Sequence, residues 1–198
     1  EVASAALRGE LQPVIEWLQK DGHVVDALNE NGKGLLHAAA GGGQLHAMKE
    51  LLQRGASVDL RDTRGNAALM VAAGVGELTV VRLLLEDRAG VDLQNARGVT
   101  ALMAAAFGGY TECVQELLGT GASTELCDVD GGTAVRRAEE EGHAAIAKVL
   151  RQHAATPPAS VALLLPDEIG LAARRGELQP VIEWLQKGGH VDALNENG

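Results

Sequence analysis

Apolar positions recur along the chain at the spacing of an α-helix, in short stretches that glycines interrupt. The stretch at residues 78–86 shows this spacing, with apolar side chains at Leu78, Val81, Leu84 and Leu85. An Ala-rich stretch precedes it, and similar short Ala-rich runs occur elsewhere in the chain. Isolated helices this short are marginal in water, so neighbouring segments must hold them. The pattern predicts helix–turn–helix units, with Leu84 and Leu118 in a continuous core between them.

The glycine that separates the two helices of each unit recurs at a fixed period. Four anchor glycines follow one another at the same interval, without a slip: Gly43, Gly76, Gly109 and Gly142. A turn-rich segment such as "RDTRGN" precedes each unit, and the anchor glycine suits a left-handed cap at the end of the first helix. The period predicts a solenoid whose copies stack to bury their apolar faces, with a turn or hairpin projecting from each.

Both the spacing and the residue types of this unit resemble the ankyrin repeat. The matching segments are "NENGKGLLHAAAGGGQLHAMKELLQRGASVD", "DTRGNAALMVAAGVGELTVVRLLLEDRAGVD", "NARGVTALMAAAFGGYTECVQELLGTGASTE" and "DVDGGTAVRRAEEEGHAAIAKVLRQHA". The resemblance implies an all-α solenoid of stacked ankyrin repeats. The proline of the family's TPLH element is absent, and its histidine remains only at His37. These losses should weaken hydrogen bonds between neighbouring repeats without changing the fold.

The period also divides the chain into expected repeats. They fall at about residues 1–31, 32–64, 65–97, 98–130 and 131–153, followed by a Pro-containing connection at 154–166 and a further repeat at 167–198. The repeat at 131–153 is polar where the others are apolar, for example at Glu139, Glu140 and Glu141. Terminal repeats need a polar face toward solvent, so we expect this repeat to serve as a C-terminal cap.

Residues 172–187 differ from residues 5–20 only where Arg174 replaces Leu7. So close a match among diverged repeats indicates that a block of several repeats was duplicated. We therefore expect 167–198 to be the first repeat of a second block, in a fragment of a longer tandem protein. Because Gly176 follows Gly142 at almost the same interval as the anchor glycines, we expect the second block to continue the stack, with Leu163, Leu164 and Leu165 buried.

Composition and charge narrow the function. Aromatic residues make up only 2 % of the 198 residues, so Ala, Leu and Val must fill the interior. The net charge of −10 argues against nucleic-acid binding, which needs a basic footprint, and favours either solubility or a basic partner. No apolar run reaches the roughly 20 residues of a membrane span. The two cysteines form no CxxC motif, so we expect an intracellular, cytoplasmic protein; the start at Glu1 leaves a targeting segment open.

Signatures of catalysis and of cofactor or metal binding are absent from the sequence. The glycine clusters at 41–43 and 74–76 lack the following lysine and the preceding strand of a phosphate-binding loop. His37 and His143 occupy positions where the ankyrin resemblance implies loop-ordering hydrogen bonds, and Cys113 falls at an apolar helix position. We expect no enzyme, no cofactor, and no catalytic or metal-binding residue.

The resemblance implies that partners contact the hairpin tips and the exposed face of each first helix. Carried onto this chain, the candidate partner-binding residues are Lys33, Arg64, Asn66, Val75, Arg97, Val99, Phe107 and Asp130. The central tips have a basic character, which comes from Arg61, Arg64 and Arg97. This charge predicts a partner with an acidic stretch. Phe107, the only phenylalanine, falls at a solvent-facing position, where it contacts a partner or packs against a neighbouring repeat.

Two functions remain open. The first is a protein–protein interaction module that binds a protein or peptide through its concave face and hairpin tips. The second is a structural spacer, or a subunit of a larger assembly or tandem-repeat protein. Arginine and aromatic residues, which are enriched at binding hot spots, favour the first, and the block duplication favours the second.

Overall fold

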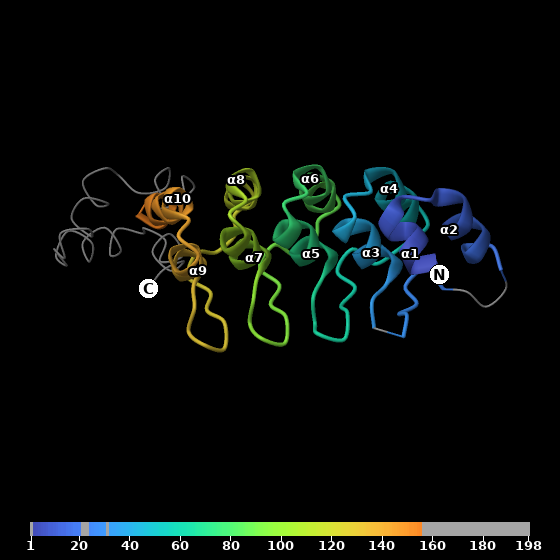
Figure 1. Ribbon diagram of the computed structural model, residues 1–198, viewed down its shortest axis with the longest axis horizontal. Helices are drawn as coiled ribbons and strands as arrows, with labels where there is room; N and C mark the ends of the chain where they lie inside the picture. Colours follow the sequence, from blue (N-terminus) through green and yellow to red (C-terminus); the bar gives the residue numbers. More distant parts are fainter. Residues whose placement is uncertain (1, 21–23, 31, 156–198) are drawn as a thin grey trace, which may run out of the picture. The chain divides into compact units, whose positions relative to one another are not determined.

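The computed structural model describes residues 2–20, 24–30 and 32–155, and within them it contains ten helices and no strand (Figure 1). The first helices of the pairs are α1 (Val2–Arg8), α3 (Leu35–Gly41), α5 (Ala68–Val75), α7 (Ala101–Gly108) and α9 (Ala134–Glu140). The second helices are α2 (Leu11–Leu18), α4 (Leu45–Gln53), α6 (Leu78–Glu86), α8 (Thr111–Gly119) and α10 (Ala144–Ala155). The expectation of an all-α repeat solenoid is confirmed.

The chain divides into two compact units, Glu1–Gln152 and His153–Gly198. In the first unit, each of the first helices packs against the first helix of the next pair, and α4, α6 and α8 pack in a second row. Hairpins project beside the row of α3, α5, α7 and α9 (Figure 1). Apart from the end of α10, the second unit lies outside the described residues, as do the expected continuation of the stack and the burial of residues 163–165.

The anchor glycines end the first helices as the sequence predicts. Gly76 and Gly109 are left-handed C-caps with φ angles of 81° and 78°, and Gly43 and Gly142 also have positive φ. Residues that carry a side chain rarely adopt this conformation. At Gly76 a Cβ atom would also lie only 2.3 Å from the ring of Tyr110. Glycine is therefore required where the chain turns into the second helix.

The core consists of alanines, mostly from the first helices, and of larger apolar side chains from both helices of each pair, with Leu69 and Leu102 as examples from the first helices. Leu84 on α6 is 0 % exposed and Leu118 on α8 is 6 % exposed, so both predicted core leucines are buried. Cys113, also on α8, is buried as expected. Alanines at the contacts between α3, α5 and α7 let these helices approach closely, which explains how a protein with few aromatic residues fills its interior.

Backbone hydrogen bonds join the hairpins to one another. The amides of Thr63, Ala96 and Val129 donate to the carbonyls of the preceding hairpin, over 3.2, 3.0 and 2.9 Å. In the three hairpins that follow the first, an Asp or Asn side chain accepts from two backbone amides; Asp62, for example, accepts from those of Arg64 and Asn66. These bonds satisfy the backbone polar groups of the turns and fix the tips relative to the helices.

His37 makes the inter-repeat bond that the resemblance implies, because its Nε2 donates to the carbonyl of Asn66 over 2.8 Å. Methionines occupy the equivalent positions in the next two repeats and cannot do so. Other side chains supply bonds there: Arg61 and Gln94 each donate to a carbonyl of the following hairpin, over 2.6 and 2.9 Å. Bonds between neighbouring repeats therefore persist where the histidine is missing.

Candidate partner-binding surface

The exposed side of α3, α5 and α7 carries small or apolar residues without charge. We call this the inner surface; its residues, all at least partly exposed, are Ala38, Gly41, Gly42, Val71, Gly74, Val75, Ala104, Phe107 and Gly108. The other residues of these three helices are buried. On a chain with a net charge of −10, an uncharged surface across three helices is unusual, since solvent-facing helix positions are ordinarily polar.

Phe107 and Val75 expose much of their surface, 53 % and 44 % respectively. Phe107 lines a groove of about 390 Å³ that is formed by α5, α7, α9 and the hairpins that flank α7. We call it the inner groove; it is lined by Gly74, Arg97, Val99, Met103, Ala104, Phe107, Asp128 and Arg137. Phe107 thus faces solvent as predicted, and at the same time forms one side of a depression.

Gly74 also lines the inner groove, from the last turn of α5. Its backbone does not have a positive φ, and a Cβ atom there would lie 3.6 Å from its nearest neighbour, the Cβ of Ala104. Alanine would therefore fit, and within a helix it is more stable than glycine by up to about 1 kcal/mol. By contrast, a Cβ at Gly42 would collide with the carbonyl oxygen of Leu7 at 1.9 Å. The glycine at 74 keeps the groove open.

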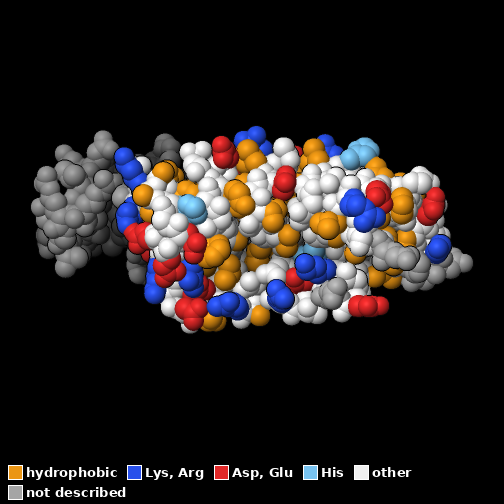
Figure 2. All heavy atoms as spheres, viewed as in Figure 1, with side chains coloured by type: hydrophobic (Ala, Val, Ile, Leu, Met, Phe, Trp, Pro, Cys, Tyr) orange, Lys and Arg blue, Asp and Glu red, His pale blue; other side chains and the backbone are white. Residues whose placement is uncertain are grey.

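The inner surface itself is uncharged, and the charged residues beside it are on the hairpin tips. Figure 2 shows Lys and Arg side chains, together with some Asp and Glu, along this edge. Arg64 is exposed, and none of the described residues forms a hydrogen bond or ion pair with its guanidinium. Arg61 instead donates to a backbone carbonyl of the next hairpin. Arg97 pairs with Asp130 at 3.3 Å, with both side chains largely exposed, so its charge is offset. The predicted basic character therefore rests mainly on Arg61 and Arg64.

Three further residues from the predicted set differ in their surroundings. Lys33 is exposed at the first described tip. Asn66 is half-buried, and its side-chain amide is used within the hairpins: it donates to Asp62 over 3.0 Å and accepts from Asn95 over 2.8 Å. Val99 is half-buried in the wall of the inner groove. Lys33 and Val99 are therefore free to meet a partner, whereas Asn66 mainly orders the tips.

An ion pair closes one end of the inner groove. The carboxylate of Asp128 accepts from Nε of Arg137 over 2.7 Å and from its second terminal nitrogen, and from the amides of Asp130 and Gly132. Burial of the Asp128 carboxyl acts to raise its pKa, but the bonds from Arg137 and from the amides outweigh it and leave the pKa below its usual range. The pair therefore adds no net charge to the groove.

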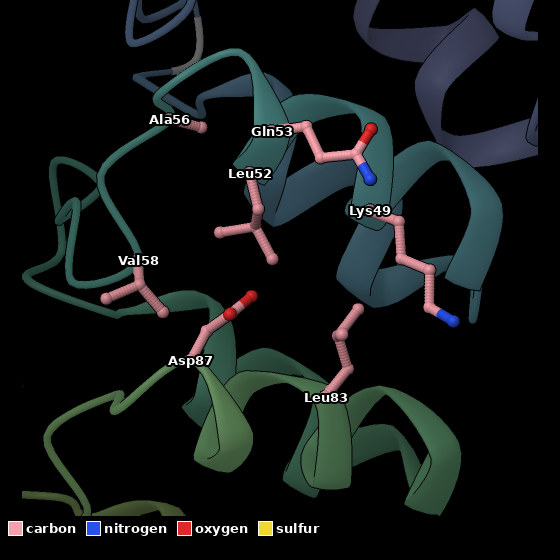
Figure 3. Close-up of a pocket in the computed structure, with 7 residues that line it drawn as sticks. All are labelled: Lys49, Leu52, Gln53, Ala56, Val58, Leu83 and Asp87. Atoms are coloured by element: carbon pink, nitrogen blue, oxygen red, sulfur yellow. The ribbon is translucent and has the colours of Figure 1, made fainter.

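A second, larger groove of about 600 Å³ lies on the other side of the repeats, between α4 and α6 (Figure 3). Leu52, Val58 and Leu83 point into this outer groove, while the ammonium group of Lys49 points away from it. The three aliphatic side chains are only half-exposed and pack against the core. The inner surface, where Phe107 is more exposed, is therefore the better candidate for contact with a partner.

The described residues offer no other candidate chemistry. No group of three His, Cys, Asp or Glu side chains among them could hold a metal ion, and none of their helices is long and apolar enough to cross a membrane. His143 donates from Nε2 to the carbonyl of Phe107 over 3.1 Å, a bond between repeats. Burial, with the nearby Glu112, Glu77 and Glu116, raises the pKa of Cys113.

Gly74, Met103, Ala104, Asp128 and Arg137 line the groove although the sequence did not single them out as site residues. Gly74 had a usable signal, because it stands one repeat period before Phe107 and therefore at the same position of its helix. A glycine at the position that an exposed aromatic residue occupies in the next repeat predicts a depression beside that residue. The other four have no distinguishing signal, since methionines and alanines are common throughout these helices, and a turn aspartate and a helix arginine occur in many repeats without lining a groove.

The sequence model of the family described as ankyrin repeats, in three copies, matches residues 2–95 and 87–160. The chain therefore belongs to the ankyrin-repeat family. Ankyrin repeats are in general protein–protein interaction modules and typically have no enzymatic activity. Among curated proteins, none matches this chain significantly.

Proposed function

We propose that this chain binds a protein partner, through a peptide segment or a folded surface, on its inner surface and hairpin tips. The observation that carries the proposal is the exposed pair Phe107 and Val75 on an uncharged surface, with the guanidinium of Arg64 on the tips beside it. Arginine and aromatic side chains contribute most of the binding energy at many interfaces. The general role of ankyrin repeats in protein interactions supports the proposal.

The charge of the tips favours a partner with an acidic stretch. Arg61 and Arg64 are not paired with a carboxylate among the described residues, and an exposed pair such as Arg97–Asp130 contributes little. An acidic segment would meet complementary charge there, which guides encounter and fixes orientation. The acidic remainder of the chain would repel such a segment from other faces.

Selection from a phage-displayed library of random peptides on the immobilised 198-residue chain tests the proposal. The test variant carries Arg64→Glu and Phe107→Ala. The matched control carries Lys49→Glu and Leu83→Ala, which make the same change of charge and a similar truncation at the outer groove. We expect selected peptides to bind the wild type and the control variant, and to lose binding to the test variant.

Peptides that bind the test variant as well as the wild type would refute the proposal, as would a selection that yields no binder. Circular dichroism of both variants establishes that they remain folded. An empty selection would favour the alternative, a spacer or assembly subunit, which the near-identity of residues 172–187 and 5–20 supports.

A further inference from the structure

We propose that the inner groove receives one bulky apolar side chain of the partner, from a segment that also carries a carboxylate for Arg64. This inference rests on the proposed function and specifies what the partner presents. The occupant would sit on Gly74 and Ala104, against the ring of Phe107. The groove lies between consecutive repeats and is open to solvent on the side of the inner surface.

The lining of the groove fits an apolar group. Met103 and Ala104 form its base, and Val99 and Phe107 are the larger apolar side chains around it. Its volume of about 390 Å³ exceeds that of any single side chain, so a leucine, methionine or aromatic residue would enter without displacing a helix. An apolar side chain bound in the groove would also cover Phe107, which is otherwise 53 % exposed to solvent.

The charges around the groove select the neighbours of that apolar residue. Asp128 and Arg137 neutralise each other within the groove, and Asp130 offsets Arg97 at its edge. Arg61 and Arg64, which pair with no carboxylate of the described residues, lie on the neighbouring hairpin; its Arg64 carbonyl accepts the amide of Ala96, the residue next to Arg97. A segment that places an apolar side chain in the groove therefore passes close to Arg64, where an aspartate or glutamate is complementary.

The observations favour such a segment over a second copy of this chain. The tips are basic whereas the chain as a whole is acidic, with a net charge of −10. A second copy could use acidic patches, but its large exposed apolar residues on the described part are single residues on different elements: Val75 and Phe107 on this same inner surface, and Leu7, Val24, Leu28 and Val129 elsewhere. A peptide segment can enter between projecting hairpins, where two rigid solenoids would meet at their tips.

The test uses peptides from the selection that bind the wild type and fail to bind the Arg64→Glu, Phe107→Ala variant. We expect them to share a leucine, methionine, phenylalanine or tryptophan close to an aspartate or glutamate. Replacing that apolar residue by alanine should weaken binding about 30-fold, the effect of a hot-spot residue. Gly74→Leu, which fills the groove, should weaken binding of the original peptide by at least about tenfold.

Two further measurements separate filling of the groove from damage to the fold. Gly74→Ala should melt at or above the wild-type temperature and still weaken binding, by less than Gly74→Leu. In a double-mutant cycle, replacing the apolar peptide residue should have little further effect on the Gly74→Leu protein. Wild-type affinity in Gly74→Leu, or additive effects in the cycle, would overturn this inference while leaving the proposed function intact. Failure to select any such peptide would overturn both.

Discussion

Replacing Leu84 by alanine tests the stacked core at its centre. Leu84 is 0 % exposed on α6, which packs against α4, α5 and α8. The three carbon atoms removed correspond to about 2.4 kcal/mol at ~0.8 kcal/mol each. A residual void of roughly 50 Å³, at about 24 cal/mol per Å³, adds about 1 kcal/mol. We therefore expect Leu84→Ala to lower the free energy of unfolding by about 3–4 kcal/mol.

Leu150→Ala on α10 provides the comparison, because Leu150 is also 0 % exposed but belongs to the last described helix pair. In a stack coupled through nearest neighbours, damage at the centre separates the two halves, whereas damage at an end frays only that end. Urea unfolding followed by circular dichroism gives the free energies, and hydrogen exchange gives the location. We expect Leu84→Ala to reduce amide protection from α3 to α8, and Leu150→Ala to reduce it in α9 and α10. A smaller loss of stability for Leu84→Ala than for Leu150→Ala would refute this account of the core.

Three other outcomes follow from the structure. The lowered pKa of Asp128 means that the folded state favours the ionised carboxylate. The ionised carboxylate therefore contributes its full stabilisation of the fold above the pKa of the unfolded state, and this stabilisation is lost as pH falls below about 4. Asp128→Asn should cost about 1.5–3 kcal/mol at pH 7 and give a flatter decline of stability between pH 5 and 3 in urea titrations. A thiol reagent should modify exposed Cys127 rapidly and buried Cys113 only on denaturation; mass spectrometry of the singly labelled chain checks the site, and labelling of Cys113 in the native protein would contradict it. Affinity for a selected acidic peptide should fall as ionic strength rises through the screening range, and binding unaffected by salt would argue against a role for Arg64.

The sequence predicted the architecture because the architecture depends on local signals that repeat. Gly76 and Gly109 cap helices through a backbone conformation that few other residues adopt, so their spacing directly reports the length of the unit. The burial of Leu84 and Leu118 follows from helical periodicity alone. Each repeat supplies an independent instance of the same pattern, which is why the prediction extends across the whole first unit.

The details of the surface depend on side-chain pairing between repeats, which no local pattern specifies. Arg97 has the sequence context of an exposed basic tip, but Asp130, at the equivalent place in the next repeat, lies within 3.3 Å of it. Gly74 stands beside a capping glycine and resembles part of the turn, yet it is helical and borders a groove. The orientation of Phe107 was predictable from its helix position, whereas the depression beside it arises from residues on three helices and two hairpins.

The hydrogen bonds between hairpins bear on binding as well as on stability. The carbonyl of Arg64 accepts the amide of Ala96, and the carbonyl of Arg97 accepts that of Val129, so the backbones of these tips are ordered before a partner arrives. Asp62 and Asn95 hold each turn from within. Ordering of loops is one of the main free-energy costs of association. Here that cost would be met during folding, so the partner segment that we propose would bind the groove and the cationic tips without rearranging the backbone that carries them.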